Sequence, residues 1–389
     1  MSRSTQLATE LQGGCDLCGA TPEPVYRAAD TARDADVCVC LSCGLVQTVY
    51  GGREEGRHAP STSSGAGWGN IRHGKGLRLD AVKEILATKL DWSTIHDVLD
   101  VGSNRGDFAH WLFEHASTSD LIAIEPDCHI VESYKTDDRI DLRVARFEHV
   151  NLPPTSIDLA FCFHTLEHAA SALNMLQQIR DALRPDGRLF LEVPNLALID
   201  DPHIAEDFFI DKHSFHFDSA SMLDLLAVAG FVPEWGPLDD DSNITVIARR
   251  AEPTTVALCP ERAARHIDLI ERYAHHLAEN REALVGIAER IGELAARQRT
   301  AVWGAGRLFD ALIRFGGLDP SALLVIDEYL ARHLDTIHGV PVQRSDVLRR
   351  DPPQVVFVLA KSSAADITQR IRSFGIKNVV TYQDLLSAN

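Results

Sequence analysis

Two pairs of cysteines near the amino terminus have the spacing of metal ligands. Cys15 and Cys18 form one C-x-x-C pair, Cys40 and Cys43 form the other, and a glycine follows each pair. Four thiolates complete the tetrahedral shell of a structural zinc and leave no open position for a substrate. The glycines let the backbone turn so that its amides face the sulfurs. We therefore expect a zinc-binding module and linker over residues 1–70, with a cluster of free thiols as the alternative.

A glycine turn between an apolar strand and a helix forms a candidate ligand site. The segment DVLDVGSNRGDF contains Asp100, Gly102, Asn104 and Gly106. Glycine permits close approach of a ligand, and the first amides of a helix bind carboxylates. Serine and asparagine stand where the dinucleotide fingerprint has its second glycine, so a ligand without a pyrophosphate fits better. The next apolar run, LIAIEP, ends in Glu125, which is placed to accept hydrogen bonds from two ribose hydroxyls.

Histidines in two later segments are candidate proton acceptors. HTLEH follows the apolar run IDLAFCF, and IDKHSFHF comes after the run GRLFLEVP. Imidazole titrates near neutral pH, so a histidine can take a proton from a substrate while a neighbouring carboxylate orients it. The alternative for each histidine is ordinary capping or packing. The candidates for a general base and its partner are His213, His168, Glu167 and His216.

Five landmarks in order resemble those of the class I S-adenosylmethionine-dependent methyltransferases. They are DVGSNRGDF, IEPD, the third-strand segment VARFEHVNLP, IDLAFCFHTLEH and LRPDGRLFLEVPN. The resemblance implies a Rossmann-like domain that binds S-adenosyl-L-methionine. The residues it implies are Asp100, Gly102, Asn104 and Gly106 around the methionine part, Glu125 at the ribose, Phe147 and Glu148 beside the adenine, and His164 at the start of the loop beside the sulfonium.

The complete layout resembles the zinc-containing sugar C-methyltransferases, which alkylate keto-deoxysugars carried on a nucleoside diphosphate. His213 stands at the position of that family's candidate base, but Ile210 and Lys212 replace its tyrosine and glutamate. Removing a proton next to a carbonyl needs a base and a group that stabilises the enolate, whereas a hydroxyl or amine needs only a base. From the resemblance we expect C-methylation of a nucleotide-linked deoxysugar in a biosynthetic pathway, whereas the two replaced residues favour a hydroxyl or amine acceptor. The alternatives are O- or N-methylation of a sugar or other small metabolite, and a zinc-stabilised binding protein without catalysis.

The rest of the chain predicts the elements that position these residues. Short apolar runs alternate with helical patterns over residues 71–255, which is typical of a mostly parallel sheet covered by helices. Residues 256–299 predict a long helix or helix pair, and residues 300–389 predict a smaller Rossmann-like α/β domain. A heptad in the helix predicts either a homodimer seam or packing against a neighbouring domain. Its members are Ile270, Leu277, Leu284 and Ile291.

Two further loops are candidates for contacts with a nucleotide. In the carboxyl-terminal domain, Gly304, Gly306 and Arg307 lie in a lone G-x-G turn, and Asp327 ends the next apolar run. A lone G-x-G is a weak signal and implies no second cofactor. Upstream of the first strand, WGNIRHGKG places basic residues among glycines, which fits either a lid that contacts phosphate or a solvated loop.

The net charge and the apolar runs of the chain restrict the kinds of partner that it can bind. The chain has 38 Lys and Arg against 56 Asp and Glu, a formal net charge of -18 that repels the phosphate backbone of nucleic acids. Its first residues, MSRSTQLATELQGG, lack the apolar core of a signal peptide, and no apolar run reaches about 18 residues. We therefore expect a cytoplasmic protein with a small-molecule acceptor and neither a nucleic-acid nor a membrane partner.

Overall fold

The computed structural model divides into two compact units. It describes residues 14–28, 35–50, 77–116, 120–127, 134, 137–200, 208–210, 213–237, 243–256, 258–332, 334–360 and 363–386. Among these, the first unit holds the residues up to Ile199 and from Phe208 to Glu271, and the second holds Asp200 and the residues from Arg272 on. No helix in the described ranges combines the length and the apolar character needed to cross a bilayer.

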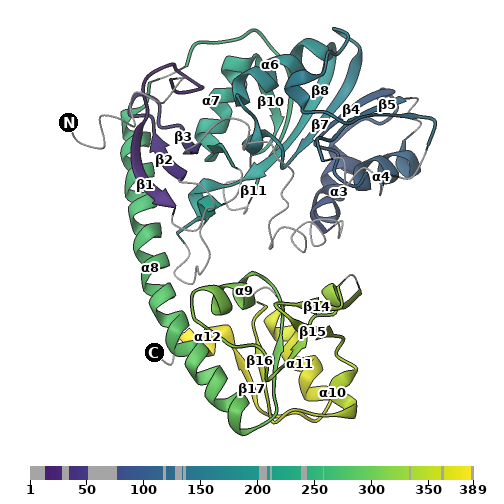
Figure 1. The fold of residues 1–389 in the computed structure, drawn as a ribbon. Helices are drawn as coiled ribbons and strands as arrows, with labels where there is room; N and C mark the ends of the chain where they lie inside the picture. The colour runs from purple at the N-terminus through teal and green to yellow at the C-terminus, as the bar shows by residue number, and fades with distance from the viewer. Residues whose placement is uncertain are drawn as a thin grey trace. The chain divides into compact units, whose positions relative to one another are not determined.

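A seven-stranded sheet forms the centre of the first unit (Figure 1). In chain order its strands are β4 (Asp97–Val101), β5 (Asp120–Ile124), β6 (Ile140–Arg143), β7 (Ile157–Phe163), β8 (Leu183–Pro194), β10 (Phe231–Trp235) and β11 (Asn243–Arg250). The spatial order is β10-β11-β8-β7-β4-β5-β6, with β4 to β8 parallel and β11 antiparallel to both of its neighbours. The chain order reverses between β4 and β7, and sheets of this kind bind ligands at the carboxyl ends of the strands beside that point.

This sheet confirms the predicted Rossmann-like α/β fold, with one local difference. The third strand, β6, ends at Arg143, so the segment VARFEHVNLP follows that strand and does not form it. Within that segment, the single-turn helix η2 (Phe147–His149) begins instead. The chain turns after Arg143, where the amide of Ala145 donates to the carbonyl of Arg143 at 3.1 Å.

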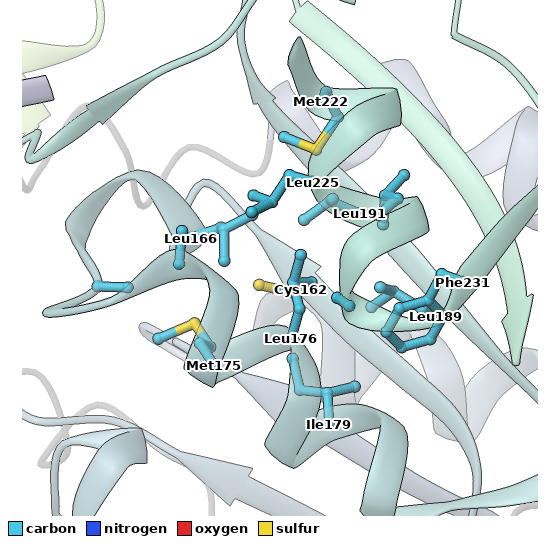
Figure 2. Close-up of a cluster of buried hydrophobic side chains, with 14 of the residues drawn as sticks. Cys162, Leu166, Met175, Leu176, Ile179, Leu189, Leu191, Met222, Leu225 and Phe231 are labelled. Atoms are coloured by element: carbon cyan, nitrogen blue, oxygen red, sulfur yellow. The ribbon is translucent and has the colours of Figure 1, made fainter. Parts of the chain in front are cut away.

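Helices cover both faces of the sheet because successive residues of a strand point to opposite faces. The helices are α3 (Leu77–Lys89), α4 (Asp107–His115), α6 (Ala172–Ala182) and α7 (Ser219–Ala229). Phe161 of β7 packs with α3 and α4, and its ring stacks on that of Phe108 with centroids 3.8 Å apart. The next residue, Cys162, packs on the other face with α6 and α7, in the cluster that Figure 2 shows around Met175 and Leu225. The sheet therefore has a separate apolar core on each side.

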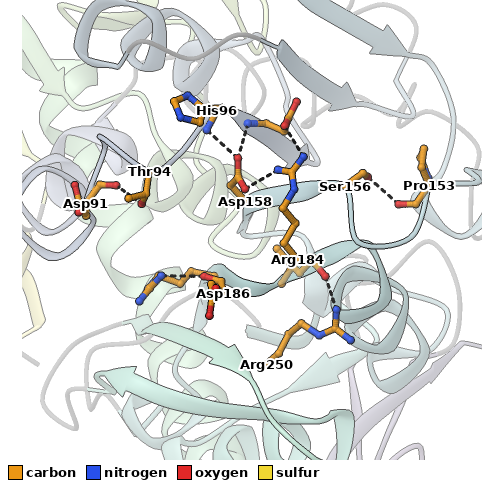
Figure 3. A network of polar contacts seen from close by, with 12 residues as sticks. Asp91, Thr94, His96, Pro153, Ser156, Asp158, Arg184, Asp186 and Arg250 are labelled. Carbon is orange, nitrogen blue, oxygen red and sulfur yellow. Dashed lines mark hydrogen bonds and ion pairs between the residues drawn. The ribbon is translucent and has the colours of Figure 1, made fainter.

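A polar network ties together the amino-terminal ends of β4, β7 and β8 (Figure 3). Oδ2 of Asp158 accepts hydrogen bonds from the backbone amides of His96 and Asp97, at 2.9 and 3.0 Å. Arg184 donates to Asp158 and, at 2.8 Å, to Asp97. Burial would raise the pKa of Asp158, but these donors outweigh it and lower that pKa. This end of the sheet is stabilised by paired charges and is opposite to the carboxyl ends of the strands.

The cysteine module forms a second, four-stranded sheet in the first unit. Its strands, in spatial order, are β1 (Glu23–Ala28), β2 (Ala35–Val39), β3 (Val46–Tyr50) and β9 (Phe215–His216). The fourth strand comes from the segment between β8 and α7, far along the chain. Val46 pairs with His216 and Gln47 with Phe215, in antiparallel register. The module is thus continuous with the segment that carries the later histidines.

The long helix α8 (Pro260–Arg297) holds one turn of the cysteine module in place. Arg262 donates to the carbonyl of Cys43 at 3.2 Å and pairs with Asp224 of α7 at 2.7 Å. His266 lies between the carbonyl of Gly44, 2.7 Å from Nδ1, and Asp218, 3.1 Å from Nε2. All of these groups lie in the first unit. The helix, α7 and the second cysteine turn therefore form one buried polar junction.

A six-stranded sheet forms the second unit (Figure 1). Its strands are β12 (Thr300–Trp303), β13 (Leu323–Ile326), β14 (Thr336–Ile337), β15 (Val340–Gln343), β16 (Val355–Val358) and β17 (Val379–Thr381), and its helices are α9 (Arg307–Arg314), α10 (Val347–Arg350), α11 (Ala364–Ser373) and α12 (Tyr382–Leu386). The spatial order is β14-β15-β13-β12-β16-β17, and only β14 is antiparallel to its neighbour. This confirms the smaller α/β fold predicted for the carboxyl-terminal region.

The heptad of α8 packs within the chain itself. Ile270, Leu277, Leu284 and Ile291 are all buried, with at most 3% of any of these residues exposed. Leu284 and Ile291 belong to the apolar core of the second unit. Of the two readings of the heptad, packing against neighbouring parts of the same chain therefore accounts for these four residues.

Gly44 is the position at which the junction with α8 is most sensitive to substitution. Its φ is 81°, and a Cβ there would lie 2.7 Å from Cγ of Arg262. We expect Gly44→Ala to cost about 1–2 kcal/mol for the left-handed backbone, and about 1–3 kcal/mol more because Arg262 must give up hydrogen bonds. Gly19, in the first cysteine turn, is the matched control, because its φ is 77° and nothing lies within 4 Å of its Cβ position. Calorimetric unfolding that shows equal destabilisation by Gly44→Ala and Gly19→Ala would contradict this account of the junction.

Candidate active site

The glycine turn after β4 has the left-handed backbone that glycine favours. Gly102 and Gly106 have φ of 76° and 81°. A Cβ on Gly102 would lie 2.0 Å from Oγ1 of Thr165, and one on Gly106 would lie 2.8 Å from the ring of Tyr134. We expected these glycines to admit a ligand, and the structure shows that they also admit two protein side chains. Both of those side chains come from later segments, so the turn sequence does not reveal them.

Two buried carboxylates stand at the carboxyl ends of β4 and β5. Glu125 is oriented by backbone amides, because Asn104 donates to Oε2 at 2.8 Å and Asp127 donates to Oε1 at 2.9 Å. Burial raises the pKa of Glu125, although these two amides partly offset it. Asp100 is 2% exposed, and its Oδ2 has no hydrogen-bond partner among the described residues. Burial, together with the nearby charge of Glu125, raises the pKa of Asp100 well above its usual value.

A partly open pocket lies between residues that are next to these carboxylates in the chain. It brings together four of the predicted site residues, namely Gly102, Phe147, Glu148 and His168. The remaining residues of its wall are Val101, Ile124, Pro126, Arg146, Thr165 and Met175. The wall thus joins the ends of β4, β5, β6 and β7, as expected of a ligand site at the point where the strand order reverses.

Arg146 is a wall residue that the sequence reasoning missed. Its guanidinium donates to Oε1 of Glu148 at 2.8 Å, and the amide of Ala170 donates to the same oxygen at 2.9 Å. Burial would raise the pKa of Glu148, but this amide and Arg146 outweigh it and lower that pKa. Glu148 is therefore a fixed anion whose Oε1 is already occupied. The signal available in the sequence was an arginine two residues before the glutamate.

His164 lies between two carboxylates. Its Nε2 is 3.2 Å from Oε1 of Glu192, and its Nδ1 is 3.4 Å from Oε1 of Glu167. Its φ of 50° is uncommon for a residue other than glycine. Glu192 also accepts a hydrogen bond from Oγ1 of Thr245 at 2.6 Å. We did not predict Glu192, although a glutamate within the apolar run LFLEVP was a usable signal, because such a charge must be paired when the strand is buried.

Three of the four candidate catalytic residues come together, and the fourth does not join them. Ligand-competent atoms of Glu167, His168 and His213 all lie within 4.8 Å of one another, and the two imidazole centroids are 4.7 Å apart. Burial would raise the pKa of Glu167, but the neighbouring histidines, His164 first, outweigh it and hold that pKa at about 2. His168 has 40% of its side chain exposed, whereas Glu167 has 1%. The cluster therefore presents an accessible imidazole in front of a buried anion.

His216 points instead into the cysteine module's sheet. It is 2% exposed, and its Nε2 is 2.6 Å from Oγ1 of Thr48. Burial, and then the nearby His213, lower the pKa of His216 well below its usual value, so this imidazole is neutral. Its ring centroid is 6.2 Å from that of His213, but the hydrogen bond to Thr48 occupies its Nε2.

The cysteine module holds the segment that carries His213. The amide of Thr48 donates to the carbonyl of Ser214 at 2.9 Å, and the hydroxyl of Tyr50 donates to the carbonyl of His213 at 3.0 Å. The amide of Ser214 donates to the carbonyl of Glu167 at 2.7 Å. Ser214 thus links the module to the single-turn helix η3 (Leu166–His168). Ile210 ends the short helix η5 (Phe208–Ile210), and Lys212 lies outside the described residues.

The four predicted metal ligands form a compact cluster. Sγ of Cys15 is 3.5 Å from that of Cys43, and Sγ of Cys18 is 3.4 Å from that of Cys40. Four sulfurs at about 2.3 Å from a central zinc would be about 3.8 Å apart, so the observed arrangement needs little adjustment. The spare thiol, Cys38, donates to the carbonyl of Asp36, and burial raises its pKa to about 12.

The G-x-G turn of the second unit is held by internal hydrogen bonds. The carboxylate of Asp327 accepts from the amides of Ala305, Tyr329 and Leu330, at 3.2, 3.1 and 2.9 Å. Asp327 therefore joins the turn after β12 to the one after β13. Arg307 begins α9, with Gly306 as its N-cap. The predicted basic loop WGNIRHGKG lies outside the described residues.

Several solved structures are similar to part of this chain. An S-adenosylmethionine-dependent methyltransferase from Mesorhizobium loti is 18% identical over 44% of this chain and 98% of its own, with a TM-score of 0.37. A related protein from Listeria monocytogenes is 15% identical over 44% and 100%, with a TM-score of 0.36. N,N-8-amino-8-demethyl-D-riboflavin dimethyltransferase from Streptomyces davawensis is 22% identical over 42% and 51%, with a TM-score of 0.35.

A protein-family model matches a large part of the first unit. No curated protein matches the chain, but residues 72–234 match the model of a methyltransferase domain. The matched range contains the glycine turn, Glu125 and the segment from His164 to His168, and it excludes the four cysteines and the second unit. The chain therefore contains a class I S-adenosylmethionine-dependent methyltransferase domain.

Proposed function

We propose that this protein transfers a methyl group from S-adenosylmethionine to a small-molecule acceptor bound next to His168 and His213. The observation that carries the proposal is that His168 lines the same cavity as Gly102, Ile124 and Phe147. Gly102, Ile124 and Phe147 would hold the donor, and His168 would face the acceptor. A donor and a proton acceptor at one cavity are what methyl transfer needs, because its rate depends chiefly on positioning and on one proton transfer.

The donor site is assigned to residues that fit the charge and shape of the ligand. Asp100 has a buried oxygen without a hydrogen-bond partner in the described ranges, which suits the ammonium of the methionine part. Glu125, fixed by two amides, would accept hydrogen bonds from the ribose, and Phe147 and Glu148 would flank the adenine. Asn104, Gly102 and Gly106 shape the turn. When bound, the donor supplies a sulfonium methyl group, whose carbon–sulfur bond breaks as the electron pair of the acceptor attacks and leaves a neutral thioether.

The catalytic cluster is assigned to Glu167, His168 and His213. Glu167 would stabilise positive charge close to the two imidazoles, and His168 is exposed enough to meet an acceptor. His164 serves as the buried link between Glu167 and Glu192, which we prefer to a direct contact with the sulfonium. His216 has a positioning role through Thr48, because a neutral, buried imidazole cannot reach an acceptor.

The acceptor that we favour is a nucleotide-linked deoxysugar. Support comes from the resemblance of the layout and from the position of His213 after β8. In this assignment residues 71–255 bind the donor, residues 1–70 are the zinc module, residues 256–299 form the linking helix, and residues 300–389 contribute to binding the nucleotide. Ile210 and Lys212 favour O- or N-methylation of a sugar as the second candidate, since they remove a tyrosine and a glutamate.

Titration with S-adenosylhomocysteine tests the donor site. We expect the wild type to bind it in calorimetry and Glu125→Gln to bind at least about tenfold more weakly, since each hydrogen bond with a charged group contributes about 1.5–3 kcal/mol. Glu114→Gln, an exposed change on α4, is the control and should bind as the wild type does. If the wild type does not bind, the enzyme proposal fails and a non-catalytic binding protein becomes the better account.

Titration with thymidine diphosphate tests the acceptor. We expect it to bind independently of S-adenosylhomocysteine, and a thymidine-diphosphate keto-deoxysugar to gain one methyl group in mass spectrometry. His213→Gln should lower that turnover by about 10²–10⁴-fold, as expected for the loss of a general base, and leave S-adenosylhomocysteine binding unchanged. Binding of S-adenosylhomocysteine without any binding of the nucleotide would move the proposal to an acceptor that carries no nucleotide.

Metal analysis tests the cysteine site. We propose that the four thiolates hold one structural zinc, which when bound supplies four bonds that crosslink the two turns. We expect one zinc per chain, loss of that zinc in Cys18→Ser, and a lower melting temperature in the same variant. Cys38→Ser is the control, because this buried thiol lies outside the cluster. Full zinc content in Cys18→Ser would rule out this ligand set.

A further inference from the structure

The carboxylate of Glu167 is buried without a hydrogen bond. Its side chain is 1% exposed, and neither oxygen has a hydrogen-bond partner within the part of the chain that the structure describes. Two imidazole nitrogens approach Oε1, with Nδ1 of His164 at 3.4 Å and Nε2 of His168 at 4.0 Å. A buried carboxylate in this state is unfavourable unless a positive charge lies close to it. The position next to Glu167 therefore favours a cation.

Among the described residues, two buried carboxylates share one buried imidazole next to Glu167. His164 is shared between two carboxylates, those of Glu167 and Glu192. Even as an imidazolium, it offsets only one of these two negative charges. Thr245 donates a hydrogen bond to Glu192 but adds no charge. In the described part of the chain, compensation of the second negative charge comes from the side of Glu167 that faces His168 and His213.

Three metal-ligand side chains converge on that side. One carboxylate oxygen of Glu167 and one ring nitrogen each of His168 and His213 lie within 4.8 Å of one another. Two imidazoles and one carboxylate suit divalent transition metals, and three protein ligands leave coordination positions open for a substrate. Metal bonds of about 2.0–2.2 Å bring such atoms to about 3 Å apart, and rotation of the partly exposed His168 side chain can supply this closure.

The backbone fixes the two segments that carry these ligands. The amide of Ser214 donates to the carbonyl of Glu167 at 2.7 Å, so the residue after His213 is tied to the residue before His168. The carbonyl of His213 accepts a hydrogen bond from Tyr50 at 3.0 Å. The three side chains are thus held together by the fold, which is what a preformed site requires.

We propose that Glu167, His168 and His213 bind one divalent transition-metal ion, and that this ion holds an oxygen atom of the methyl acceptor. This inference rests on the proposed function, because His168 also lines the cavity assigned to the donor. The ion stabilises the negative charge on that oxygen once the acceptor's proton has passed to water. A tyrosine hydroxyl could donate a hydrogen bond to such an oxygen, but position 210 is an isoleucine. Under this proposal His168 and His213 are ligands, so the loss of turnover in His213→Gln reflects loss of the ion and not of a free base.

Binding of Mn²⁺ to the full chain, with zinc in its cysteine site, tests the proposal. Mn²⁺ prefers carboxylate and imidazole to thiolate, so it reports on this cluster and not on the cysteines. In titrations followed by electron paramagnetic resonance we expect one Mn²⁺ per chain. We expect binding at least about tenfold weaker in Glu167→Gln and in His168→Gln. His96→Gln is the matched control, because it removes an exposed histidine next to the start of β4, at the other end of the sheet.

S-adenosylhomocysteine titrations of the same samples separate the two proposals. An unchanged melting temperature in His168→Gln shows that this exposed variant is folded, even if the buried change at Glu167 impairs folding. Absence of Mn²⁺ binding, or equal Mn²⁺ affinity in the wild type and His168→Gln, overturns the metal site and leaves methyl transfer standing. Failure of the wild type to bind S-adenosylhomocysteine overturns the proposed function instead.

Discussion

The backbone of Ser214 carries the interaction on which the site depends. Its carbonyl accepts a hydrogen bond from Thr48 of the cysteine module, and its amide donates to Glu167 of the methyltransferase domain. A strand of two residues, such as β9, has too few hydrogen bonds to be stable alone. Its conformation therefore depends on the sheet that β1, β2 and β3 provide. The module is part of the wall that positions His213, in addition to any role in metal binding.

The long helix α8 explains why that module stays in register. Arg262 and His266 bond to carbonyls of the second cysteine turn and to carboxylates of α7. Such buried polar groups favour one arrangement of α8, α7 and the second cysteine turn, because any other arrangement leaves these groups without hydrogen-bond partners. Burial would raise the pKa of Asp218, but His266 outweighs it and lowers that pKa, so the junction weakens as acid protonates this carboxylate. The same helix goes on to bury its apolar face in the second unit.

The two ends of the central sheet use charge in different ways. At the amino-terminal end, Asp158 and Asp97 are paired with Arg184. At the carboxyl end, Asp100 and Glu167 are buried with carboxylate oxygens that have no hydrogen-bond partner among the described residues. Buried carboxylates destabilise the protein when no ligand is bound. They become favourable once cationic groups bind, because the ligand charge and the carboxylates then stabilise each other. We read this difference as the physical division between a structural end and a functional end of the sheet.

The sequence by itself determined the features that depend on local order. Paired C-x-x-C turns, the glycine turn after β4 and the alternation of apolar runs all encode their backbone within a few residues, so the α/β fold and the cysteine cluster could be predicted. The tertiary structure alone decided which side chains meet. Tyr134 and Thr165 approach the glycines, Glu192 holds His164, and Thr48 bonds to His216. These contacts join residues that are distant in the chain. The distances between such residues are fixed only when the sheets pack, so a single sequence does not reveal them.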